Sequence, residues 1–262
     1  MRDFRNLSAR KPARIAAGAA GACIAAFLLS GSSCPTPEPA LPERLSAPRV
    51  QSPEMAITAV YRGSEYRAAV HLEWLPPQND SGGVATFTVL RNSIDKVDSG
   101  FIIVPQGIPG DITSLDDVVD DIGFPPTCSY RLLYYRVLAI DRYGRSSDTS
   151  AIDSFTLAAQ PAITTPLDTL DIPCTVSWQM GCIMMPYRSF LRLWSQSGLV
   201  WESPKPVELS YGTEHGVDYF AAAVPDSLHS RIAGGTCWLG AVVEAQAGDY
   251  AQSIALRKLV VR

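Results

Sequence analysis

Alternating apolar and polar residues over 133–140 form the clearest pattern in the chain. One face carries Leu133, Tyr135, Val137 and Ala139, and the other face carries Arg136, Leu138 and Ile140. A period of two residues is typical of a β-strand whose inner face packs on an opposing sheet. Turn-forming residues follow from Asp141 to Gly144. The pattern therefore predicts a central strand that ends in a tight turn.

Other segments of the same half also have strand patterns. Residues 55–61 and 85–90 predict two strands, and residues 69–74 alternate strongly, with Trp74 on the inner face. Between residues 92 and 126 the pattern is weaker. Its best strand is 101–104, followed by a turn rich in proline and glycine. This half of the chain is therefore expected to be built from short strands.

Two of these segments resemble the fibronectin type III family. The pattern Y-x-V-x-A-x-D-x-x-G-x-x-S, from Tyr135 to Ser147, resembles strand F, the FG turn and the entry to strand G. The alternation that ends at Trp74 resembles strand B, whose tryptophan fills the core. The resemblance implies a β-sandwich over residues 47–158. Leu133 stands where the family has a tyrosine near the start of strand F, so a tyrosine corner is not expected.

Residues 159–262 repeat part of this pattern. Cys174 to Trp178 aligns with Val70 to Trp74, and Cys237 to Gly248 can be laid over the first strand F. Residues 254–261 then supply a closing strand. The repetition predicts a second, divergent fibronectin type III or immunoglobulin-like domain. The expected fold class is all-β, with two tandem immunoglobulin-like sandwiches.

The N-terminus has the order of a secretory signal. A basic region precedes an apolar run over 15–29, which is short for a membrane-spanning helix, and small residues follow. Cys34 comes next, and this order resembles a bacterial lipobox, in which the cysteine is acylated. We therefore expect a lipoprotein-type signal peptide over 1–33 and lipidation of Cys34. Gly31 replaces the usual leucine of that motif, and simple secretion is the alternative.

Residues 34–46 are rich in proline and predict an extended tether. Polyproline II rises ~3.1 Å per residue, so the tether can hold a domain roughly 45 Å from its anchor. A disordered tail without a role is the alternative interpretation.

Charge limits the partners that the protein can have. The chain has 22 basic and 26 acidic residues, and 18% of its residues are charged. Loss of residues 1–33 removes five basic residues and Asp3, which leaves 17 basic residues, 25 acidic residues and a net charge of −8. This balance argues against nucleic acid and against an anionic membrane surface. The expected partner is another envelope or extracellular protein, or a polysaccharide, with membrane contact through the N-terminal lipid alone.

Four cysteines remain after the signal and the anchor are set aside: Cys128, Cys174, Cys182 and Cys237. Export favours disulfides. In the resembled family, strands B and F begin at one pole of opposing sheets, which implies a Cys174–Cys237 bridge that closes about 60 residues and contributes ~2–4 kcal/mol. Tandem domains of that family meet through loops corresponding to those of Cys128 and Cys182, which implies a second bridge. Four cysteines allow three pairings, and Cys174–Cys182 is the open alternative.

No motif predicts catalysis, a cofactor or a metal site. His71, His215 and His229 lack metal-ligand spacing, and there is no G-x-S-x-G, phosphate-binding glycine loop or C-x-x-C. Five aspartates crowd residues 111–121 without the spacing of an EF-hand. We expect surface histidines and a solvated acidic loop.

Aromatic residues in the second half are the binding candidates. Arg192 and Trp194 share one strand face, and Trp201 follows the turn at 197–198. An exposed tryptophan beside an arginine can stack on a sugar ring or anchor a peptide. Burial of these tryptophans in the core is the alternative.

Together these features favour a non-catalytic, exported and lipid-anchored protein. We expect it to act as a spacer or a protein-interaction module at the bacterial cell envelope, held in a membrane as a lipoprotein or else secreted. The alternative is an accessory carbohydrate-binding protein of an extracellular polysaccharide-degrading system, which requires Trp194 or Trp201 to be exposed.

Overall fold

The first folded half consists of strands arranged in two layers. The computed structural model describes residues 41–51, 55–79, 83–93, 100–104, 107–125, 129–181, 187–207, 209–214, 217–232, 235–245 and 251–262. The strands of the first half are β1 (Arg49–Val50), β2 (Ala56–Arg62), β3 (Glu65–Leu75), β4 (Val84–Asn92), β5 (Ile102–Ile103), β6 (Ile108–Pro109), β7 (Ser114–Val118), β8 (Tyr130–Asp141) and β9 (Asp153–Ala158). One sheet has the order β1-β3-β2, with β7 also paired to β3, and faces the strands β9-β8-β4 with β5 and β6 beside β4.

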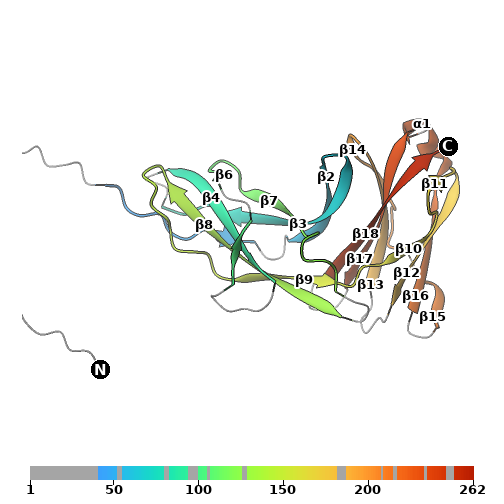
Figure 1. The fold of residues 1–262 in the computed structure, drawn as a ribbon, viewed down its shortest axis with the longest axis horizontal. Coiled ribbons are helices and arrows are strands. Elements are labelled where there is room, and N and C mark those ends of the chain that lie inside the picture. Colours follow the sequence, from blue (N-terminus) through green and yellow to red (C-terminus); the bar gives the residue numbers. More distant parts are fainter. Residues whose placement is uncertain are drawn as a thin grey trace, which may run out of the picture. The chain divides into compact units, whose positions relative to one another are not determined.

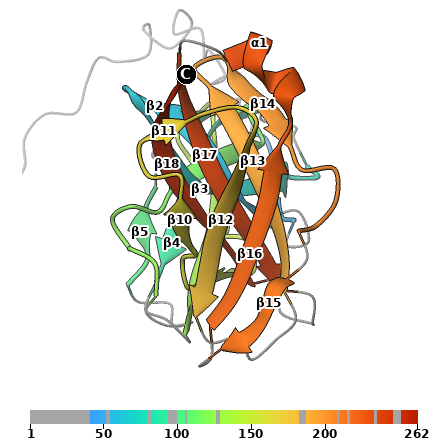
Figure 2. The ribbon, with the colours of Figure 1, turned by 90° about the vertical axis from the view of Figure 1, so that its right-hand side faces the viewer.

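The second half forms another pair of layers. Its strands are β10 (Ala162–Thr165), β11 (Thr169–Leu170), β12 (Cys174–Gly181), β13 (Tyr187–Ser195), β14 (Gly198–Glu202), β15 (Leu209–Glu214), β16 (Val217–Val224), β17 (Thr236–Ala245) and β18 (Ala251–Val261). A 3-10 turn (Asp226–Leu228) and the short helix α1 (His229–Ile232) connect β16 to β17. Figure 2 shows β10, β12, β16 and β15 as one layer in front of β18, β17 and β13. The four-stranded sheet matches the ABED sheet of immunoglobulin domains.

The alternation of side chains explains both cores. Along β8, Leu133, Tyr135, Val137 and Ala139 are all buried, as their shared face predicts. Trp74 is 1% exposed and meets the ring of Phe87 edge to face, with 5.5 Å between centroids. Trp178 is fully buried and stacks on Phe220 at 5.8 Å. The expectation of an all-β fold with a tryptophan at each centre is confirmed.

The two sandwiches share a sheet, which the sequence did not predict. Strand β18 pairs in parallel with β9, where Ala251 lies opposite Thr156 and Gln252 opposite Leu157. This pairing joins strands from both halves into one ten-stranded sheet among the described residues. Both sandwiches accordingly belong to one compact unit, residues 42–262. Figure 1 shows β9 running from β8 toward the base of β18.

The contact between the sandwiches also differs from the loop-to-loop arrangement implied by the family resemblance. The end of the β2–β3 hairpin packs against the outer face of β13, β17 and β18. That face carries large apolar residues, so covering it removes apolar surface from water.

Among the described residues, no helix is long and apolar enough to cross a membrane.

Candidate functional site

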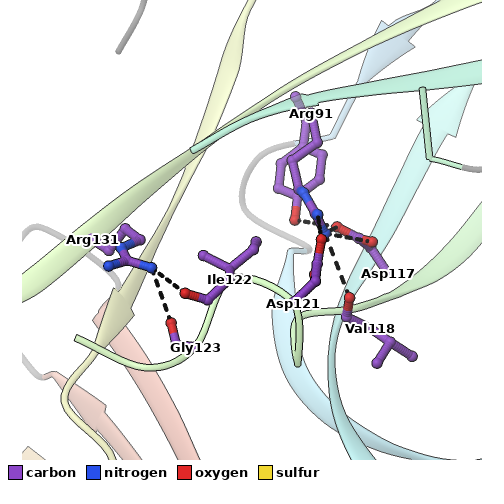
Figure 3. A network of polar contacts seen from close by, with 8 residues as sticks. Arg91, Asp117, Val118, Asp121, Ile122, Gly123 and Arg131 are labelled. Carbon is purple, nitrogen blue, oxygen red and sulfur yellow. Dashed lines mark hydrogen bonds and ion pairs between the residues drawn. The ribbon is translucent and has the colours of Figure 1, made fainter. Parts of the chain in front are cut away.

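A buried network of hydrogen-bonded polar side chains lies inside the first sandwich. Arg91 of β4 and Asp117 of β7 point toward each other between the two sheets (Figure 3), and Tyr135 of β8 bonds to the same carboxylate. Nη1 of Arg91 donates to both carboxylate oxygens of Asp117, at 3.0 and 2.8 Å, and the Tyr135 hydroxyl donates to Oδ2 at 2.8 Å. Arg91, Asp117 and Tyr135 are respectively 3%, 1% and 0% exposed.

A loop after β7 closes this network at the surface. Nη2 of Arg91 donates to Oδ2 of Asp121 at 2.5 Å, and the Asp121 side chain is 60% exposed. Arg131 donates to the carbonyl oxygens of Ile122 and Gly123, which holds the same loop from β8 (Figure 3). The loop is therefore fixed by two arginines from neighbouring strands.

Burial dominates the electrostatics of the network. It raises the pKa of Asp117, and the charge and hydrogen bonds of Arg91 and Tyr135 offset part of that effect. Burial also raises the pKa of Tyr135 well above its usual value, followed by the charge of Asp117, so the phenol stays protonated and donates. For Arg91, burial lowers the pKa but Asp117 raises it overall. Arg91 and Asp117 neutralise each other, and with Tyr135 they connect the two sheets, so the site is a cross-link within the sandwich.

The sequence analysis missed this network, although the alternation contained a signal for it. Arg91 has the same parity along β4 as the buried residues Phe87 and Val89. A charged residue on the inner face of a strand needs a buried partner. The family's tyrosine corner was not expected, and Leu133 is indeed buried in the core, while the neighbouring inward residue Tyr135 bonds to Asp117.

The predicted acidic loop is paired with basic groups. Asp116 bonds to His71, Asp117 and Asp121 bond to Arg91, and Asp120 lies 3.2 Å from Nη1 of Arg67. Over the described part of the chain, no group of three histidine, cysteine or acidic residues is arranged to hold a metal ion.

His71 lies on the outer face of β3 between two carboxylates. Its Nδ1 is 2.7 Å from Oδ1 of Asp116, and its Nε2 is 3.2 Å from Oε1 of Glu73. Burial lowers the pKa of His71, but the hydrogen bonds and charges of Asp116 and Glu73 outweigh burial and raise it overall. The imidazole is thus a titratable link between β3 and β7.

The interface between the sandwiches is aromatic. Tyr66 lies 5.8 Å from Trp194 and 5.2 Å from Trp238, measured between ring centroids, and Tyr61 lies 5.5 Å from Trp238. Trp194 is 6% exposed and Trp238 is 2% exposed. Burial, followed by the charge of Tyr61, raises the pKa of Tyr66, and its hydroxyl donates to the carbonyl oxygen of Ser195 at 2.8 Å.

One further hydrogen bond crosses between the halves: the backbone N–H of Ile57 donates to Oε1 of Gln252 at 2.6 Å. Within the second half, Nε2 of Gln160, just after the junction, donates to the carbonyl oxygen of Ile254 at 3.1 Å. Ile254 itself belongs to the core of the first sandwich. The interface therefore combines apolar packing with directional bonds.

The three predicted binding residues have different surroundings in the structure. Trp194 is buried at the interface, where it cannot stack on a sugar ring. Trp201 is half-buried against the second core, opposite Leu193. Arg192 is engaged by Glu202. The first sandwich therefore covers Trp194, and the other two residues are engaged within the second sandwich.

Cys174 and Cys237 are free thiols in this structure, so the implied bridge is not formed. Both pack into the second core, Cys174 from β12 and Cys237 from β17 in the opposing sheet. Burial, followed by the charge of Cys174, raises the pKa of Cys237 to about 12. Cys34, Cys128 and Cys182 lie outside the described residues, as do the signal peptide 1–33 and most of the tether.

The end of the predicted tether belongs to the first sandwich. Leu45 is buried in its core, and Arg44 forms an ion pair with Asp148 at 3.5 Å. The side chain of Asn79 bonds to the backbone on both sides of Leu45, at Arg44 and Ser46. Folded structure therefore begins before residue 47.

Comparisons with known proteins do not identify a family for this chain. Neither a protein-family model nor a curated protein matches the sequence. Among solved structures, the chain is similar to the crystal structure of chicken CNTN1 FN1-FN3 domains, with 12% sequence identity and a TM-score of 0.30. The match covers 83% of this chain and 66% of that chain, which is just under two thirds of that chain's length. The sheets define the class, an all-β protein of sandwich type.

Proposed function

We propose that this protein is a non-catalytic module of the bacterial cell envelope, exported and lipid-anchored through Cys34. In this role its two sandwiches act together as one stiff spacer or interaction unit at the end of the proline-rich tether. The observation that carries the proposal is the burial of Trp194 and Trp238 beneath Tyr61 and Tyr66. Domains joined by small polar contacts move relative to each other, whereas an apolar interface resists that motion.

Stiffness suits a spacer because the distance between anchor and partner then depends on the tether alone. The shared β9–β18 pairing and the hydrogen bond between Ile57 and Gln252 support this interpretation. Calorimetric unfolding tests it. Coupled sandwiches unfold in one cooperative transition, and two resolved transitions would contradict the proposal.

The anchor is tested in the expressing bacterium. Metabolic labelling with an alkyne-bearing fatty acid should tag the wild-type chain and leave a Cys34→Ser variant untagged. Both proteins should be followed through membrane fractionation, because loss of the lipid should release the variant from the membrane fraction. An unlabelled wild-type chain in the culture medium would support simple secretion instead.

An accessory carbohydrate-binding role is the second candidate function. Trp194 and Arg192 no longer support it, since one is buried and the other is paired. What favours it is a pocket at the end of the second sandwich that carries α1 and the β13–β14 turn, lined by neutral polar groups, Ile232 and one arginine.

A further inference from the structure

A pocket of about 450 Å³ lies between the β13–β14 turn and residues at the end of α1 and the start of β17. It is lined by Ser195, Gln196, Ser197, Arg231, Ile232, Gly235 and Thr236. Its volume lies within the range of roughly 300–1,000 Å³ that is typical of small-molecule sites. Its lining residues were not among the candidates that the sequence suggested.

Both walls of the pocket are held in place. The hydroxyl of Tyr66 donates to the carbonyl oxygen of Ser195, and the hydroxyls of Ser195 and Ser197 are 2.7 Å apart. On the opposite wall, the backbone N–H of Val261 donates to the carbonyl oxygen of Gly235 at 2.9 Å. A ligand therefore need not order Ser195, Ser197 or Gly235 on binding.

Arg231 distinguishes this pocket from a second cavity, which lies beside Tyr66. In the cavity of about 270 Å³ beside Tyr66, Arg67 is neutralised by Asp120. In contrast, the lining of the larger pocket contains no carboxylate, and no ion pair or hydrogen bond of the exposed Arg231 side chain is found among the described residues. An unpaired guanidinium beside serine and threonine hydroxyls favours an anion with planar, bidentate oxygens.

We propose that this pocket binds a hexuronate residue of an acidic polysaccharide, because Arg231 supplies a local positive charge on a chain whose net charge is negative. Arg231 takes the carboxylate, and the hydroxyls of Ser197 and Thr236 and the amide of Gln196 suit the several hydroxyls of the sugar ring. Ile232, buried in the core below, supplies an apolar floor for the ring's C–H face. An isolated acidic side chain of a peptide would use the arginine but leave the neutral polar groups without partners.

Titration calorimetry on the full exported chain tests this site with an oligogalacturonate and a neutral cello-oligosaccharide of equal length. The oligogalacturonate should bind at millimolar or lower concentration and at least about tenfold more tightly than the neutral oligomer. Arg231→Gln should weaken uronate binding by about tenfold or more, which corresponds to 1.4 kcal/mol. Thr236→Val, which keeps the shape and removes the hydroxyl, should weaken it roughly two- to tenfold.

Arg49→Gln is the matched control, because Arg49 is exposed on β1 of the other sandwich. It should leave binding unchanged. Equal binding of neutral and acidic oligomers, or an unaltered affinity of Arg231→Gln, would overturn the proposal. An absence of binding would also overturn it. If polyglutamate binds as tightly as the oligogalacturonate, with the same dependence on Arg231, the pocket is instead a site for an acidic peptide. The pocket does not depend on the lipid anchor, so a negative result of the fatty-acid labelling experiment would not contradict this proposal.

Discussion

The indole of Trp194 lies directly against Gly240 of the neighbouring strand: a Cβ atom added to that glycine would lie 2.4 Å from Cζ3 of the ring. Gly240 pairs with Arg192 across the β13–β17 ladder, so the absence of a side chain on β17 leaves the space that the indole fills. Trp194 in turn contacts Tyr66 of the other sandwich. One glycine therefore allows the interface to close.

Gly240→Ala should destabilise the protein and loosen this interface. The added methyl group must displace Trp194, and overpacking of this kind costs about 1–3 kcal/mol. Urea unfolding followed by tryptophan fluorescence measures the loss. Gly235→Ala is a suitable control, because the nearest atom to its added Cβ is 3.4 Å away. Equal stability of the two variants would contradict the predicted clash.

Asp117→Ala should be far more harmful than Asp121→Ala. Removal of Asp117 leaves Arg91 buried without its main counter-charge, and breaking a buried pair costs about 3–5 kcal/mol. Asp121 is 60% exposed, and an exposed pair contributes at most about 1 kcal/mol. Both variants should be compared by equilibrium denaturation. Similar losses for the two would show that Arg91 depends equally on both carboxylates.

His71 should make stability depend on pH. Its pKa in the folded protein is raised above 6.5 by Asp116 and Glu73, so the folded state binds the proton more tightly than the unfolded state. The resulting stabilisation is fully present below pH 6.5 and is lost as the pH rises through the folded pKa. The measurement is the difference in unfolding free energy between wild type and His71→Gln across that range. A difference that stays constant with pH would contradict the prediction.

The Cys174–Cys237 disulfide stays a prediction that the exported protein can test. The two thiols enter one core from opposing sheets, and oxidation would close a loop of about 60 residues, with a gain of ~2–4 kcal/mol. Peptide mapping under non-reducing conditions, on protein isolated from the envelope, should recover a peptide that joins these two positions. Cys237→Ser supplies the control, since the linked peptide should vanish. A peptide joining Cys174 to Cys182 would exclude this bridge.

The local pattern of apolar and polar residues alone predicted strands in both halves and the central tryptophan of each core. Because successive side chains of a strand point to opposite faces, burial of one face leaves an alternation that can be read directly, as from Leu133 to Ala139. The predicted segment 55–61 accordingly matches β2 to within one residue, and the segments 85–90 and 254–261 lie inside β4 and β18. Trp74 and Trp178 are buried where the alternation places them.

The sequence by itself thus determined the all-β class, the alternation within each strand and the two central tryptophans. Only the tertiary structure decided what covers the outer face of β13 and β17, because alternation specifies that a face is apolar and not which surface packs on it. For the same reason, the sequence could not distinguish an exposed Trp194 from one beneath Tyr66. The partners of Arg91 and the surroundings of Arg231 also come from strands and loops far apart along the chain, and only folding brings them together.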